Sequence, residues 1–189
     1  MIADLVHNNR SIRRFSQEVS MDLDTLKALV DLARLSPSGR NLQPLKYKLV
    51  CTPENCAQVF PLLGWAGYLP DWPGPAEGER PSAYIIILGD RTISQSFNTD
   101  AGLALQSILL GVVERGLGGC IIGTVQRETL ADLFKIPNHL EIIYVLALGT
   151  PAETVLVEPM PDSGDVRYWR SPDQVHHVPK RSLDEIILP

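Results

Sequence analysis

A nearly unbroken apolar segment constrains the fold more than any other part of the chain. Residues 83–89 read AYIIILG, with three consecutive isoleucines and no charged side chain. A strand with one face in water alternates apolar and polar side chains, whereas this segment is apolar on both faces. It therefore predicts a strand that is buried on both faces and lies at the centre of a sheet.

Two further apolar segments belong to the same predicted core. Residues 141–149, EIIYVLALG, predict a second buried strand. Residues 96–115 form the longest predicted helix, and their apolar side chains leave little polar surface around it. Such a helix must be covered on nearly all sides, either by the core of its own chain or by another subunit.

The other periodic segments predict a mixture of helices and strands. Apolar residues at helical spacing predict four more helices, at 2–8, 22–36, 53–63 and 129–134. Alternation over residues 46–51 predicts a half-buried strand. Residues 67–81 are rich in proline and glycine, so we expect a surface loop that either borders a site or only connects elements. Past Pro151 the regular pattern is lost, and a polar, aromatic tail is expected.

Composition places the chain among globular proteins and excludes several classes of partner. Its length of 189 residues is more than one minimal core needs and less than two ordinary domains usually take, so one domain over 1–189 is predicted. A net charge of −5 argues against nucleic acid, because a phosphate backbone requires an extended basic face. No apolar run approaches the roughly 18 residues of a membrane span, and the first residues lack a signal-peptide pattern. A cytoplasmic protein without a membrane partner is therefore expected.

The cysteines and histidines do not form a metal-binding pattern. Cys51, Cys56 and Cys120 are odd in number and lack metal-type spacing, so we interpret them as buried thiols rather than a disulfide or a zinc site. The pair His176-His177 is predicted to lie at the surface rather than to bind a metal.

Three arginines gather in one short segment of this acidic chain. Residues 9–15 read NRSIRRF, which places Arg10, Arg13 and Arg14 close to Ser11. A guanidinium group can donate two parallel hydrogen bonds to a phosphate, and a serine hydroxyl adds a short neutral donor. The segment indicates an anion-binding pocket, with a solvated basic turn as the alternative.

Two loops of small residues complete the candidate site. Residues 36–44, SPSGRNLQP, follow a predicted helix, and the proline and glycine favour an irregular loop. Residues 116–124, GLGGCIIGT, combine close glycines with a short apolar strand. They have neither the Lys and Ser/Thr of a Walker sequence nor the spacing of a Rossmann fingerprint. We interpret them as backbone that comes close to a flat ligand, with Gly123 at the contact.

Four separated segments, taken in order, resemble the nitroreductase family of flavoproteins. They are RSIRRF at 10–15, SPSGRNLQP at 36–44, GLGGCIIG at 116–123 and the basic pair at 180–181. The resemblance spans nearly the whole chain. Each segment alone is a weak signal, and the resemblance is specific because all four occur together. It implies an α+β fold with helices around a central, mostly antiparallel sheet. It also implies an intertwined homodimer, with FMN in the crevice between subunits and the tail at about 155–189 wrapped around the partner.

The resemblance assigns the FMN phosphate to basic residues from both ends of the chain. Arg10 and Ser11 from the first turn would hold it, together with Arg181 and Lys180 from the tail. Asn9 departs from the family, which more often has a basic residue at that position.

Other residues are assigned to the flavin ring. Arg13 takes the place of the cation beside N1 and O2, where negative charge gathers on reduction, and Arg14 is expected to be exposed or paired with a carboxylate. Ile122 and Gly123 would present their backbone near N5, although an ordinary core position is the alternative for Ile122.

The loop at 36–44 is assigned to the ribityl chain and the ring. The resemblance places Pro37, Ser38, Gly39 and Asn41 beside them, with Gln43 as a weaker candidate. The side chains of Ser38 and Asn41 offer the neutral donors and acceptors that a polyol needs.

The implied reaction is a ping-pong hydride transfer. NAD(P)H reduces FMN at N5 and leaves, and a nitroaromatic or quinone-like acceptor then takes the same open face. The cofactor performs the redox step, and no side chain must act as an acid or a base, so no catalytic residue is predicted. Two alternatives stay open. One is a flavin-binding or flavin-consuming protein without nitroreductase turnover, and the other is a dimeric structural module whose basic turn binds another phosphate.

Overall fold

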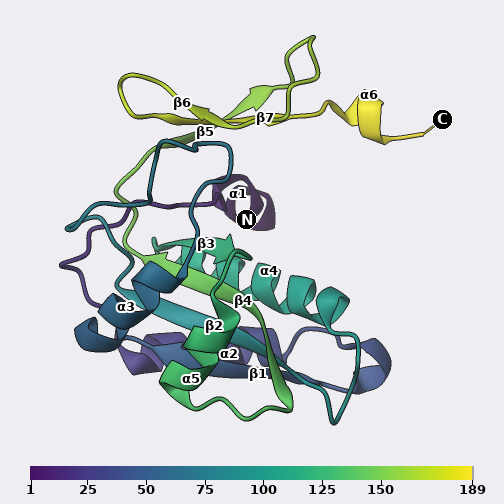
Figure 1. Cartoon of the computed structure of the whole chain (residues 1–189). Helices are drawn as coiled ribbons and strands as arrows, with labels where there is room; N and C mark the ends of the chain where they lie inside the picture. Colours follow the sequence, from purple (N-terminus) through teal and green to yellow (C-terminus); the bar gives the residue numbers. More distant parts are fainter. Residues whose placement is uncertain (189) are drawn as a thin grey trace.

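An antiparallel sheet forms the centre of the protein, which a computed structural model describes for residues 1–188 (Figure 1). Its four strands follow the order β1-β2-β4-β3 and all neighbouring pairs are antiparallel. Their bounds are Leu45–Val50 for β1, Ala83–Asp90 for β2, Gly118–Ile122 for β3 and Leu140–Gly149 for β4. The predicted α+β architecture with an antiparallel sheet is confirmed.

Helices cover both faces of this sheet. They are α2 Leu23–Arg34, α3 Pro53–Val59, α4 Asn98–Glu114 and α5 Arg127–Phe134. Helix α1 Ile2–Asn8 contacts α4 and buries no residue, and short 3-10 turns form at Gly39–Asn41 and Phe60–Leu62. Residues of α2 and α4 pack with one face of β2 and β4, whereas residues of α3 and α5 pack with the opposite face. Two apolar cores therefore enclose the sheet, one on each side.

The apolar segment 83–89 lies in β2 and is a buried central strand, as predicted. Every residue of β2 is buried, and the strand lies between β1 and β4. Ile85 and Ile87 contribute to one core and Ile86 to the other, as the two-residue period of a strand requires. The long helix α4 is covered only in part, because Leu103 remains 41% exposed.

The arginine-rich turn packs directly against the edge strand β3. Ser11 forms a parallel bridge with Gly119, and the backbone N–H of Ile12 donates to the carbonyl oxygen of Gly119 at 3.0 Å. A Cβ atom on Gly118 would lie 2.8 Å from Cγ1 of Ile12 and 2.9 Å from Cγ of Pro151. The glycines of β3 thus allow the N-terminal turn to approach the sheet closely.

The tail contains more regular structure than the sequence predicts. Strands β5 Val155–Pro159, β6 Trp169–Arg170 and β7 His176–Lys180 form a second sheet in the order β5-β7-β6, and helix α6 Leu183–Ile186 follows. The expectation of an irregular tail is therefore wrong. Proline and charged residues inside these short strands hide their alternation. Figure 1 shows this tail standing apart from the main sheet.

No helix within residues 1–188 is both long and apolar enough to cross a membrane. Among the same residues, all three cysteines are free thiols; Cys56 and Cys120 are buried and Cys51 is half-buried.

Candidate functional site

A cavity of about 170 Å³ opens at the end of β3. Its lining joins the N-terminal turn, the loop after α3, the end of β3 and the tail, through Arg13, residues 64–67, residues 120–124 and Tyr168. The three predicted positions Arg13, Ile122 and Gly123 therefore meet at one site. Part of the proline-rich loop borders it, since Gly67 lies in the lining.

The free edge of β3 supplies backbone donors to this cavity. The carbonyl of Gly119 points outward, because it accepts from Ile12 rather than from β4. In a strand, alternate residues direct their backbone groups to the same side, so the N–H of Ile121 points outward as well. The side chain of Ile122 is only 4% exposed and belongs to the apolar core, and by the same alternation its backbone N–H faces Val145 of β4, which matches the core position left open for this residue.

The guanidinium group of Arg13 is held by the tail. It lies 4.8 Å from the ring centroid of Tyr168, within cation–π range, and its Nη1 is 3.3 Å from Nε2 of His176. A third contact runs from Nη1 to the carbonyl oxygen of Ser11. These contacts fix a positive charge at the wall of the cavity.

His176 is a buried neutral residue, and the predicted surface position is wrong for it. The side chain is 1% exposed because β7 turns it toward Arg13 and Tyr168. Burial, together with the charges of Arg13 and Arg170, lowers the pKa of His176 to about 4. Since a guanidinium can only donate, Nε2 accepts and the ring proton sits on Nδ1.

A buried carboxylate connects the arginine turn to the tail. One oxygen of Glu153 accepts hydrogen bonds from the backbone N–H groups of Arg13 and Arg14, and the other accepts from Nη2 of Arg170 at 2.8 Å. The side chain of Glu153 is 1% exposed and that of Arg170 is 8% exposed. Both charges are therefore shielded from water and compensate each other.

An aromatic side chain from the proline-rich loop completes this junction. The ring centroid of Trp72 lies 4.6 Å from the guanidinium carbon of Arg170 and 5.8 Å from the guanidinium carbon of Arg14. Arg14 also pairs with Glu79 at 3.4 Å, which confirms its predicted pairing with a carboxylate.

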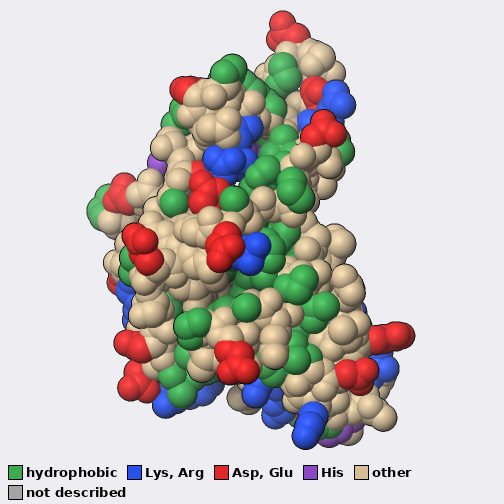
Figure 2. Space-filling view, turned by 60° about the vertical axis from the view of Figure 1, so that its left-hand side comes forward, with side chains coloured by type: hydrophobic (Ala, Val, Ile, Leu, Met, Phe, Trp, Pro, Cys, Tyr) green, Lys and Arg blue, Asp and Glu red, His purple; other side chains and the backbone are tan. Residues whose placement is uncertain are grey.

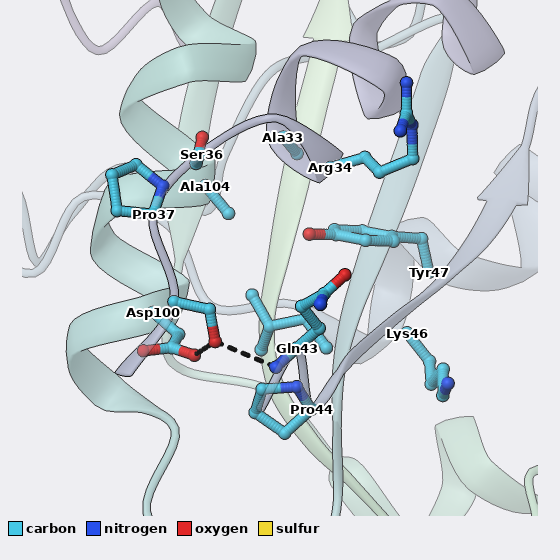
Figure 3. A pocket seen from close by; sticks show the side chains of 12 residues that line it. Ala33, Arg34, Ser36, Pro37, Gln43, Pro44, Lys46, Tyr47, Asp100 and Ala104 are labelled. Carbon is cyan, nitrogen blue, oxygen red and sulfur yellow. Dashed lines mark hydrogen bonds between the residues drawn. The ribbon is translucent and has the colours of Figure 1, made fainter. Parts of the chain in front are cut away.

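The second predicted loop is anchored by a buried carboxylate that the sequence did not single out (Figure 3). Asp100, near the start of α4, is 9% exposed and accepts from the hydroxyl of Ser38 and from the backbone N–H of Gly39 at 3.0 Å. The hydroxyl of Ser38 in turn accepts from the backbone N–H of Gln43 at 2.9 Å. Ser38 thus supports the loop through two hydrogen bonds.

This loop adopts backbone conformations that are uncommon outside glycine. Arg40, Asn41 and Gln43 have φ values of 53°, 56° and 51°. Left-handed residues of this kind cost free energy and persist where the surroundings hold them in place, often at functional sites.

The loop borders a cavity of about 220 Å³, whose walls include Pro37, Ser38 and Tyr47 (Figure 3). Burial and the negative charge of Asp100 raise the pKa of Tyr47 to about 12, so its hydroxyl stays protonated and can donate a hydrogen bond.

The predicted phosphate ligands lie in two separate places within one chain. Arg10 and Ser11 flank the start of the arginine turn, and Nε of Arg10 is buried without a hydrogen-bond partner among residues 1–188. Lys180 is the last residue of β7, Arg181 follows it, and both are exposed. Arg181 pairs with Glu185 at 2.7 Å, and no hydrogen bond or ion pair within the described part of the chain joins the two groups.

Comparison with known proteins identifies the fold and the family. The model of the nitroreductase family matches residues 6–66 and 77–150, which is more than two thirds of the chain. The chain belongs to the nitroreductase family. The unmatched residues are 1–5, a part of the proline-rich loop and the tail, and the last two segments supply Trp72, Tyr168 and Arg170.

Relatives share about a quarter of their residues with this nitroreductase-family chain. An oxygen-insensitive NADPH nitroreductase from Salmonella typhimurium is 26% identical over 204 residues, which cover 98% of this chain and 77% of the relative. An iodotyrosine deiodinase from Thermotoga neapolitana is 23% identical over 168 residues, covering 80% and 89%. An FMN-dependent nitroreductase structure from Clostridium difficile superposes with a TM-score of 0.67 at 21% identity, covering 81% and 88%.

Several residues of the site were missed at the level of sequence. Glu153 and Asp100 are buried carboxylates. In the sequence, Glu153 only follows an apolar strand and Asp100 only lies in an apolar helix, and neither pattern indicates a role in the site. Tyr168 and His176 lie in a segment without periodicity, so their approach to Arg13 depends on the tail's path and not on any local pattern.

Proposed function

We propose that the protein is an FMN-dependent NAD(P)H oxidoreductase of the nitroreductase type. The observation that carries the proposal is the cavity at the free edge of β3, where Arg13, the outward backbone N–H of Ile121 and Gly123 line the same space. A fixed cation and backbone N–H donors beside an aromatic wall suit a flat ring that gains negative charge.

The chemistry of the donor set fits FMN. When bound, FMN supplies a ring that accepts a hydride from NAD(P)H and passes it to an acceptor. Arg13 would favour the reduced ring through its charge. Ile121 and Gly123 would bind the ring through their backbone, and Ile122 would line the cavity beside them. Pro37, Ser38, Gly39 and Asn41 would flank the ribityl chain.

A separate set of cations would bind the phosphate. Arg10 has a buried Nε without a partner among residues 1–188, which suits an anionic ligand. Ser11 would add its hydroxyl, and Lys180 and Arg181 would add two charges. Because the tail pair makes no hydrogen bond or ion pair with the turn within residues 1–188, we propose that it reaches the turn of a second chain.

The active form would therefore be a homodimer in which the tail at about 155–189 wraps the partner. Large apolar side chains remain exposed on α1, on α4, on β3 and on the tail, and a second copy would cover them. They are Ile2, Val6, Leu103, Ile121, Leu183, Ile186, Ile187 and Leu188. Figure 2 shows hydrophobic side chains in the waist between the tail and the body.

The electron acceptor is proposed to be a small planar molecule such as a nitroaromatic or a quinone, taken in a ping-pong cycle. The names of the relatives include a nitroreductase and an iodotyrosine deiodinase, so proteins similar to this chain act on different substrates. The alternative function is flavin binding or flavin consumption on the same scaffold without nitroreductase turnover.

The visible spectrum of the purified protein distinguishes these functions. Protein loaded with FMN should absorb as a flavoprotein, lose that absorbance when NADPH is added without oxygen, and regain it when a quinone follows. Flavin that stays oxidised under NADPH would contradict the proposed activity and favour the binding protein. Protein that takes up no FMN would contradict both.

Substitutions at the arginine turn test the assigned roles. Arg13→Ala should lower the reduction potential of the bound flavin, because a cation beside the reduced ring is lost, whereas Arg10→Ala should mainly weaken FMN retention. Arg91→Ala removes an exposed arginine of the same charge at a distant turn and should change neither property. Equal potential and FMN content in Arg10→Ala and Arg13→Ala would refute these roles.

A further inference from the structure

A second, smaller cavity lies away from the proposed flavin site, at the start of β2. It has a volume of about 100 Å³ and is lined by residues of α3, by the segment that leads into β2 and by Gln17. Its volume excludes a flavin or a nucleotide but admits a few non-hydrogen atoms.

Three hydrogen-bonding groups of this lining lack partners. They are Nε of Arg80, the hydroxyl of Ser82 and the hydroxyl of Tyr84, each buried and without a hydrogen bond to any of residues 1–188. Tyr84 is 0% exposed. Buried polar groups are nearly always satisfied, so three orphans in one cavity point to a polar ligand.

The spacing of these residues explains why they meet. Ser82 and Tyr84 are two residues apart at the beginning of β2, which directs both side chains to the same face. Arg80 precedes them, and its guanidinium carbon lies 4.4 Å from the ring centroid of Phe60, which also lines the cavity.

The cavity is electropositive. No lining residue carries a carboxylate, and the neighbouring Glu79 is engaged with Arg14. The side-chain oxygen of Gln17 accepts from the backbone N–H groups of Gly78 and Arg80, so its remaining amide groups are donors. Burial raises the pKa of Tyr84, which therefore keeps its proton and can only add a donor to an anion.

We propose that this cavity binds a small carboxylate monoanion, separate from the flavin and from both substrates. Arg80 supplies one uncompensated positive charge, which matches a monoanion better than a dianion. A carboxylate has two oxygens with about four acceptor positions, enough for Arg80, Ser82 and Tyr84 together. Phe60 and Ala57 supply an apolar wall for a short hydrocarbon group.

Acetate is the probe, and its methyl resonance in ligand-observed NMR reports binding to the FMN-loaded protein. The titration is run at constant ionic strength against chloride, with inorganic phosphate as a second probe. We expect one acetate per chain, displaced by formate and unaffected by chloride. Binding of phosphate without acetate would overturn the carboxylate assignment, and no binding of either would show a cavity that holds only water.

Conservative variants locate the site. Tyr84→Phe removes only a hydroxyl without a partner, so the protein should keep its fold and its FMN while its affinity for acetate falls about tenfold. Arg80→Gln should abolish acetate binding. Arg91→Gln makes the same charge change at an exposed turn and should leave the affinity unaltered. Equal affinities in the wild type, Tyr84→Phe and Arg80→Gln would overturn the proposal, because acetate would then bind elsewhere.

Discussion

The buried ion pair between Glu153 and Arg170 offers the sharpest test of how the tail is held. Both side chains are almost fully removed from water, at 1% and 8% exposure, and Arg170 Nη2 lies 2.8 Å from the carboxylate. Glu153→Gln keeps one oxygen for the backbone N–H groups of the arginine turn. The other oxygen becomes an amide that faces Arg170 with its own hydrogens.

The expected cost follows from this burial. Removing one partner of a buried pair leaves the other charge uncompensated, which typically lowers the free energy of unfolding by about 3–5 kcal/mol. We therefore expect a loss of about that size for Glu153→Gln. Arg170→Gln should cost less, because the carboxylate keeps the backbone N–H groups of Arg13 and Arg14.

A second ion pair of equal length serves as the control. Arg91 Nη2 and Glu141 also lie 2.8 Å apart, but their side chains are 54% and 41% exposed. Exposed pairs contribute little, so Glu141→Gln should change the free energy of unfolding by less than about 1 kcal/mol.

Urea denaturation at one fixed protein concentration, followed by far-UV circular dichroism, measures these differences. The double variant of Glu153 and Arg170 should lose little more than Glu153→Gln alone, because the two substitutions remove the same interaction. Equal losses for Glu153→Gln and Glu141→Gln, or additive losses in the double variant, would refute the reasoning.

Two further predictions concern His176 and Gly118. The unfolded chain takes up a proton on His176 below about pH 6.5 but the folded chain only near pH 4, so stability is lost as the pH falls through this window. The loss attributable to His176 is up to about 3 kcal/mol, and His176→Gln should remove it from the pH profile of urea unfolding; an unchanged profile would contradict the buried neutral state. Gly118→Ala places a Cβ atom 2.8 Å from Ile12 and should cost about 1–3 kcal/mol. Gly67→Ala, with open space around the added atom, should cost far less, and equal melting temperatures would argue against the close contact of the turn with β3.

The main sheet could be predicted from sequence because its signals are local. An apolar run on both faces identified β2 as a central strand, and β2 lies between β1 and β4. The helix predicted from residue 22 is α2, and the side chain of Asp22 caps it by accepting from the backbone N–H of Thr25. In both cases a few consecutive residues determine the outcome.

The tail could not be predicted in this way, because its structure depends on distant partners. His176 is buried only because β7 returns to Arg13, which is 163 residues away in sequence. Glu153 also has a distant partner, because it accepts from the backbone N–H of Arg13, which is 140 residues away in sequence. Asp100 in α4 supports Ser38 in a loop 62 residues away in sequence, and no periodicity connects the two.

The central proposal is that cations from the two ends of different chains share one flavin phosphate. The most direct measurement uses two variants, Arg10→Ala and Arg181→Ala, each of which should retain less FMN than the wild type. The two variants are co-expressed with different affinity tags, and mixed dimers are purified. In a mixed dimer one chain keeps Arg181 and the other chain keeps Arg10.

If Arg10 acts with Arg181 of the partner subunit, each mixed dimer contains one site with both arginines and one site with neither. FMN retention should then recover to about one flavin per two chains at the wild-type affinity. If both arginines of a site came from the same chain, every site in the mixed dimer would lack one of them. FMN retention as weak as in the single variants would therefore contradict the account.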